Sequence, residues 1–118
     1  MKPQNNQPLP QAVQSCHDLL LWMIPQLDKF PRLRRYTLGE KINSLLLEIL
    51  EFLLDATYSK RPYTPLNKAN IKLSMLRHLW RLCMELKVID KRRYRFGSDL
   101  ITEIGQQTGG WQKYSDGK

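Results

Sequence analysis

Apolar residues recur along the chain at the spacing of α-helix faces. Between residues 11 and 30 they follow one another at alternating steps of four and three, which is the period of one helical face. These positions are Cys16, Leu20, Met23, Leu27 and Phe30. Pro31 limits the helix, because the residue before a proline avoids the α region. Pro25 removes one backbone hydrogen bond and predicts a kink in the last turn.

A second helix is predicted to begin at Thr37. Residues 37–40 read Thr-Leu-Gly-Glu, a capping box in which the threonine hydroxyl accepts from a free N–H and the glutamate reaches back. One face of this helix consists of Ile42, Leu45, Ile49, Phe52 and Ala56. The positions beside that face are also apolar, namely Leu46, Leu47, Leu50, Leu53 and Leu54, and the polar stripe is Ser44, Glu48, Glu51 and Asp55.

A helix as apolar as this second one has to be covered on more than one side. Its apolar surface exceeds what a single bundle core covers, and a monomer rarely leaves such a patch exposed. We therefore predict a homo-oligomer. The interface is assigned to the leucines Leu46, Leu47, Leu50 and Leu54.

Two further helices complete the pattern. Thr64 is placed to cap a third helix whose first position is Pro65, where a proline loses no hydrogen bond. The apolar face of this helix is Leu66, Ala69, Leu73, Leu76, Trp80 and Cys83. The fourth helix is predicted over residues 91–111, with Asp90 as its cap. Its face is Tyr94, Gly97, Ile101, Ile104, Thr108 and Trp111.

The fold class that follows is all-α. No period-two alternation is present, and short linkers favour antiparallel neighbours in an up-down-up-down four-helix bundle. We assign residues 11–113 to the bundle and residues 1–10 and 114–118 to flexible tails. Glycines inside the fourth helix, each costing about 1 kcal/mol relative to alanine, indicate either close packing or the helix end. For Gly105-x-x-x-Gly109 both interpretations stay open.

Composition is typical of one globular domain. The chain has 118 residues, 42% of them hydrophobic and 25% charged. Cys16 and Cys83 fall among apolar helical residues, which favours reduced core thiols and a cytoplasmic protein. The start lacks a charged segment followed by an apolar run, so no signal peptide is predicted. The most apolar stretch, residues 45–54, contains Glu48 and Glu51 and is too short to span a bilayer.

No pattern in the sequence predicts catalysis, a metal site or a cofactor. His17 and His78 stand apart from any Cys/His/Glu group with metal-ligand spacing. The serines and cysteines lie in no nucleophile motif, and Gly109-Gly110 belongs to no phosphate-binding loop. Glu48, Glu51 and the following Asp55 recur at helical spacing, which favours a solvated stripe or a row of intersubunit ion pairs.

Positive charge is concentrated in one part of the chain. The formal net charge is +8, yet residues 60–95 alone carry eleven cations against two acids, a local balance of +9. In an up-down-up-down bundle the first and third connections lie at the same end. That end therefore gathers nine cations, opposed only by Asp28 and Asp90. They are Lys29, Arg32, Arg34, Arg35, Lys87, Lys91, Arg92, Arg93 and Arg95.

These nine cations predict a nucleic-acid ligand. Each Lys or Arg that displaces counterions from a phosphate backbone adds a salt-dependent increment of affinity. Cations at helix C-termini that merely complement the macrodipole would explain one or two of them, not nine. Tyr36 and Tyr94 lie beside the clusters and are candidates to stack on unpaired bases, although core packing explains Tyr94 equally well.

Several segments carry recognisable motifs: residues 18–25 (DLLLWMIP), 29–31 (KFP), 35–42 (RYTLGEKI), 103–105 (EIG) and 109–111 (GGW). In these segments the chain resembles the Avd accessory proteins of diversity-generating retroelements. The resemblance covers residues 13–113. It implies a basic homopentameric barrel of four-helix bundles that has no catalytic activity, binds RNA or DNA and the element's reverse transcriptase, and supports mutagenic cDNA synthesis.

A second family, the bacterial ribosomal RNA intervening-sequence proteins, is similar in fold and in the Phe-Pro and Gly-Gly-Trp signatures. In that family a proline- and glycine-containing segment interrupts the helix that here runs without a break through residues 48–58. The uninterrupted helix favours Avd. Gln106-Gln107 departs from the basic and apolar pair expected after Gly105. A purely structural bundle that binds an acidic protein remains the alternative from a different class.

Overall fold

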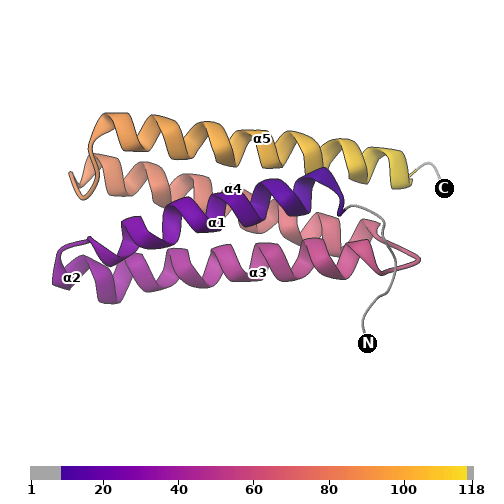
Figure 1. Ribbon diagram of the computed structural model, residues 1–118, viewed down its shortest axis with the longest axis horizontal. Coiled ribbons are helices and arrows are strands. Elements are labelled where there is room, and N and C mark those ends of the chain that lie inside the picture. Colours follow the sequence, from indigo (N-terminus) through magenta and orange to yellow (C-terminus); the bar gives the residue numbers. More distant parts are fainter. Residues whose placement is uncertain (1–8, 117–118) are drawn as a thin grey trace.

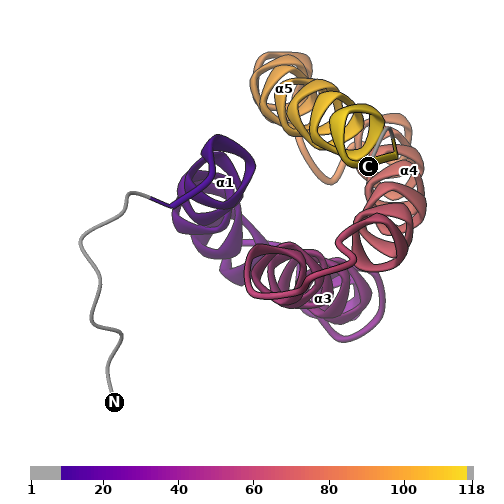
Figure 2. The same ribbon diagram turned by 90° about the vertical axis from the view of Figure 1, so that its right-hand side faces the viewer.

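Four long helices form an antiparallel bundle in the computed structural model, which describes residues 9–116 (Figure 1). They are α1 (Gln11–Asp28), α3 (Glu40–Thr57), α4 (Tyr63–Glu85) and α5 (Lys91–Asp116). A short helix α2 (Arg32–Arg34) and a π-helical segment (Arg35–Gly39) connect α1 to α3. Viewed end-on, the helices follow one another around the bundle in the order α1, α3, α4, α5, and α5 also packs against α1 (Figure 2). The predicted all-α bundle is confirmed.

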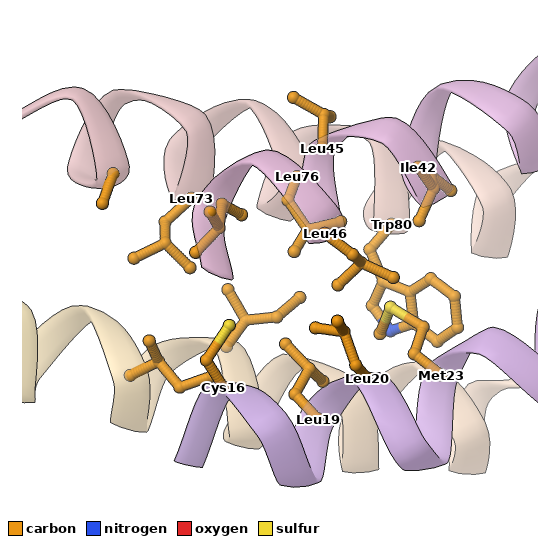
Figure 3. Close-up of a cluster of buried hydrophobic side chains, with 14 of the residues drawn as sticks. Cys16, Leu19, Leu20, Met23, Ile42, Leu45, Leu46, Leu73, Leu76 and Trp80 are labelled. Carbon is orange, nitrogen blue, oxygen red and sulfur yellow. The ribbon is translucent and has the colours of Figure 1, made fainter. Parts of the chain in front are cut away.

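The core lies along the shared axis of the four helices. Figure 3 shows α1 side chains such as Cys16, Leu20 and Met23 pointing toward Leu46 of α3 and Trp80 of α4. All five are 8% exposed or less. The predicted apolar faces of α1, α3 and α4 are buried apart from Phe52, which is partly covered. Helical periodicity therefore identified the core because each helix contributes one face to it.

The capping box predicted at Thr37 does not form. Gly39 has α-helical dihedrals (φ −60°, ψ −46°), so the chain enters α3 from the π-helical segment already coiled. The Thr37 hydroxyl donates instead to the carbonyl oxygens of Leu33 and Arg34, at 3.1 and 3.3 Å. Because the preceding residues supply helical carbonyls, the N–H groups at this point have partners and need no cap.

Helix boundaries differ from the prediction at two other places. The third predicted helix, α4, begins at Tyr63, so Thr64 is not its cap and Pro65 is its third residue. Pro65 remains harmless there because the N–H groups of the first turn lack intrahelical acceptors anyway. The fourth predicted helix, α5, continues past Trp111 to Asp116. By contrast, Asp90 caps α5 as predicted, its Oδ1 accepting from the Arg93 N–H at 2.8 Å.

The glycines of α5 play different roles. A Cβ placed on Gly97 would lie 2.6 Å from Nε1 of Trp80, so α5 approaches α4 closely at Gly97. At Gly109 a Cβ would meet nothing within 4 Å, and the helix runs on beyond it. Both interpretations of the Gly105-x-x-x-Gly109 pattern, close packing and a frayed end, are therefore wrong at Gly109. The predicted tails fall mainly on residues 1–8 and 117–118, outside the described residues, and residues 114–116 belong to α5.

Candidate nucleic-acid interface

The nine predicted cations lie on the two connections that share one end of the bundle, which we call the basic end. Figure 1 shows the α1–α3 connection and the α4–α5 connection together at the end opposite the described termini. Eight of the nine side chains are exposed, and Arg34 is half-buried. Among the described residues only Arg93 forms a salt bridge, with Asp90 at 3.9 Å. Arg35 donates to the backbone carbonyl of Asp28 at 3.3 Å.

One cation of the α1–α3 connection, Arg34, acts electrostatically on Cys83 of α4. The thiol of Cys83, near the C-terminal end of α4, is fully buried, which raises its pKa to about 11. The positive charge of Arg34 lowers the pKa of the same thiol and so opposes part of that rise. Because charge interactions weaken with distance, this effect places the guanidinium of Arg34 near the end of α4. Arg34 is thus the cation of the α1–α3 connection that acts on a residue of α4.

Four of the cations occupy the electrostatically unfavourable end of a helix. Lys91, Arg92, Arg93 and Arg95 belong to the first two turns of α5, where no acidic residue lies in the first turn. The macrodipole makes a helix N-terminus positive, so cations destabilise it and anions stabilise it. Helix stability therefore does not account for this cluster. Together with the macrodipole, it creates a positive field that a phosphate group would neutralise.

Lys87 adds a cation at a backbone position that suits glycine. Its φ is 63°, in the left-handed region. Val88 N–H donates to the Cys83 carbonyl at 2.8 Å and Lys87 N–H to the Met84 carbonyl at 3.0 Å. This pair of bonds is the Schellman motif that ends α4, and glycine is the usual residue at the left-handed position. A lysine there costs roughly 1 kcal/mol of backbone energy.

The cations share an end of the molecule rather than a single pocket. A groove of about 670 Å³ beside α5 is lined by Lys91, Arg92, Arg93 and Arg95. Lys87 lines an adjoining hollow of about 550 Å³ with Lys91 and Arg93. Arg35 faces a separate hollow of about 240 Å³ on the seam between α1 and α3. This spread suits an extended polyanion better than a single phosphate.

Of the two tyrosines proposed to stack on bases, Tyr36 is accessible. It is 58% exposed, and the Arg35 guanidinium lies 5.6 Å from its ring centroid. Tyr94 is half-buried and packs against the core, and its carbonyl accepts from the Trp80 indole at 3.0 Å. Two other aromatic residues, Trp22 and Phe96, line the groove beside α5. Sequence reasoning missed them because Trp22 comes from α1, whose pairing with α5 is a tertiary feature.

The leucines predicted for an oligomer interface divide into two groups. Leu46 is fully buried within its own bundle, so it packs inside the chain and the prediction is wrong for this residue. Leu47 is 44% exposed, and Leu50 and Leu54 are partly covered. A second apolar row was missed because it lies beside the core face of α4 and ends at the residue that follows this helix. It consists of Ile71, Met75, Leu79, Leu82 and Leu86, of which Ile71 is 53% exposed.

Two other features are absent from residues 9–116. In this part of the chain, no three side chains among His, Cys, Asp and Glu come together as a metal-binding group. Nor does any described helix have both the length and the apolar composition needed to cross a membrane.

Comparison with known proteins agrees with the resemblance seen in the sequence. No curated protein matches the chain. A family model described as bAvd-like matches residues 12–115, which include all four long helices except the first residue of α1 and the last of α5. The basic end and both apolar rows lie inside the matched range. The chain therefore belongs to the bAvd-like family.

Proposed function

We propose that this chain is a non-catalytic accessory protein of a diversity-generating retroelement, which binds RNA through its basic end and acts together with the element's reverse transcriptase. One observation carries the nucleic-acid part of this proposal. Nine cations gather at one end with a single salt bridge among them in the described structure, and four oppose the macrodipole of α5. Membership of the bAvd-like family supports the retroelement part.

A titration of structured RNA at several salt concentrations, followed by fluorescence anisotropy, tests the RNA contact. Binding is expected to show little sequence preference and to weaken steeply with salt, because phosphate contacts release counterions. The same titration with reverse transcriptase present tests the partner. We expect a ternary complex that loses stability when cations of the basic end are replaced. Full affinity for RNA after neutralisation of the whole basic end would leave charge for solubility as the better explanation.

We also propose that the protein is a homo-oligomer, and a pentamer is the form that the family resemblance implies. The two apolar rows support assembly because they differ: one contains Leu47 and Leu54 on α3, and the other contains Ile71 and Met75 on α4. Two different patches suit a head-to-tail interface, which forms a ring where the rotation between neighbouring subunits closes. A ring would present several basic ends to one RNA, so that weak single contacts gain avidity.

Light scattering at micromolar concentration tests the assembly. We expect a mass well above the 14.0 kDa of one chain. Leu47→Glu should reduce it to the single-chain mass while leaving helicity by circular dichroism intact, since Leu47 is 44% exposed. A wild-type mass near 14 kDa would exclude the oligomer. Binding to an acidic protein in place of RNA would favour the purely structural alternative.

A further inference from the structure

A groove with aromatic side chains lies between α1 and α5 at the basic end. Contacts between cations and phosphates do not account for these aromatic side chains. The groove has a volume of about 670 Å³, and it is lined by Trp22 of α1 and Phe96 of α5. Phe96 is 50% exposed and Trp22 is partly exposed. Core packing does not require a phenylalanine at a position half open to solvent. We define these two residues as the aromatic pair.

The aromatic pair is held in place by its own ring contact and by the buried Trp80. The Trp22 and Phe96 ring centroids are 4.8 Å apart with the planes tilted by 52°. Trp22 also meets the buried Trp80 edge-on, at 6.0 Å and 74°. Trp80 is in turn fixed by its hydrogen bond to the Tyr94 carbonyl and by contact with Gly97. A ligand that stacks here therefore meets a surface already ordered, which lowers the entropic cost of binding.

The charges around the aromatic pair favour an anion with an aromatic part. The groove lining includes four cations, Lys91, Arg92, Arg93 and Arg95, against the carboxylates of Asp90 and Asp99. Asp90 is already engaged, since it caps α5 and pairs with Arg93. The lining therefore keeps a positive balance next to exposed aromatic faces. A nucleotide combines the two features that match it, a flat base and a phosphate.

We propose that the aromatic pair is a stacking site for one unpaired base of a single-stranded nucleic acid, whose flanking phosphates contact the cations beside it. The inference rests on the proposed function and extends it from backbone binding to selection of unpaired over paired strands. A base inside a duplex offers no free face to Phe96, whereas an unpaired base does.

Phe96→Ala tests the site, because alanine preserves the helix and the residue is half-exposed. Its affinity is measured by anisotropy for three probes of equal length: a single-stranded RNA, the matching duplex, and a single strand with abasic sites. We expect the affinity for the single strand to fall about five- to tenfold, the loss of one base stack. Affinity for the duplex and the abasic strand should stay the same, as should the salt slope for all three. Tyr58→Ala, which removes a 71% exposed aromatic at the opposite end, is the matched control.

Trp22 supplies a second measurement that does not depend on affinity. Single-stranded RNA should quench its fluorescence, and Trp22→Phe should abolish that part of the quenching while Phe still stacks. If wild type binds RNA and Phe96→Ala binds the single strand equally well, the stacking site is excluded while the proposed function stands. An equal loss for duplex and single strand also excludes it. If wild type binds none of the probes, both proposals fail.

Discussion

The lysines in the middle of the bundle and the cations of the basic end carry the same charge but differ in their surroundings. Lys72 Nζ lies 3.3 Å from Glu48 Oε1, and Lys68 Nζ lies 5.8 Å from the centroid of the Phe52 ring. At the basic end only Arg93 has a salt-bridge partner among the described residues. Lys68 and Lys72 thus have partners within the chain, whereas most cations of the basic end form no salt bridge among the described residues.

The difference shows which charges serve the fold. The Lys72–Glu48 pair joins α4 to α3 on a partly exposed surface, where such pairs contribute at most about 1 kcal/mol. The basic end has one such pair, Arg93 with Asp90, whereas the cations at the start of α5 and the left-handed backbone of Lys87 are destabilising. A site that costs stability is expected where the residues are needed for a ligand.

The largest effect is expected from neutralising four cations of the basic end at once. The variant Arg32→Gln, Arg34→Gln, Lys91→Gln and Arg92→Gln removes up to four phosphate contacts per protomer. The slope of log affinity against log salt should then fall by about three, since each contact contributes roughly 0.7 to 0.9. Anisotropy titrations of RNA over a range of salt concentrations measure this slope.

The mid-bundle pair provides the control for that experiment. Lys68→Gln with Lys72→Gln should leave the salt slope close to the wild-type value, because both lysines already have partners and lie away from the basic end. If the pair changes the slope as much as the basic end does, the RNA runs along the side of the bundle. The contrast between the two regions would then be wrong.

Gly97→Ala is expected to destabilise the packing of α5 against Trp80 of α4. A Cβ would come within 2.6 Å of Trp80, which is fully buried and hydrogen-bonded, so the indole has to shift. We expect a loss of about 1–3 kcal/mol in the free energy of unfolding, measured with urea. Gly109→Ala should instead gain up to about 1 kcal/mol, because a Cβ there meets nothing within 4 Å and alanine favours the helix. Equal effects at both glycines would contradict the close contact.

Much of the fold was predictable from the sequence because apolar periodicity reports directly on which helix face is buried. The four helices, the core face of each and the common end of two connections follow from local patterns and helix order alone. The α5 cap at Asp90 was also predictable, because capping depends on residues only three positions apart.

The features that escaped prediction depend on contacts between distant segments or on competing local bonds. Thr37 has the right sequence for a cap, but carbonyl groups of the preceding turn compete for its hydroxyl. Leu46 looks like its neighbour Leu47, and only the packing of α3 shows that it is buried. The groove of Trp22 and Phe96 requires knowing that α1 lies beside α5.

Lys87→Gly separates the effect of the Lys87 backbone conformation on stability from the effect of its charge on RNA binding. The left-handed φ of 63° suits glycine, so the free energy of unfolding should rise by about 0.5–1 kcal/mol. Loss of the cation should lower the salt slope for RNA by roughly 0.7 to 0.9 if Lys87 contacts a phosphate. Lys87→Ala is the control, because it removes the charge but keeps the strained backbone. A gain in stability without any change in the salt slope would show that Lys87 does not contact the RNA.

The smallest effect concerns the buried thiol of Cys83, near the C-terminal end of α4. Arg34 lowers the pKa of Cys83, so Arg34→Gln should move that pKa upward from about 11. Ultraviolet absorbance of the thiolate measures the shift in a Cys16→Ala background, where Cys83 is the remaining cysteine. Arg32→Gln, which replaces an exposed cation of the same connection, should leave the titration unchanged. Bound RNA that neutralises Arg34 should move the pKa in the same direction, because a phosphate cancels the positive charge that favours the thiolate. If Arg34→Gln leaves the pKa where it was, the Arg34 guanidinium does not act on the Cys83 thiol, and no charge effect links the α1–α3 connection to α4.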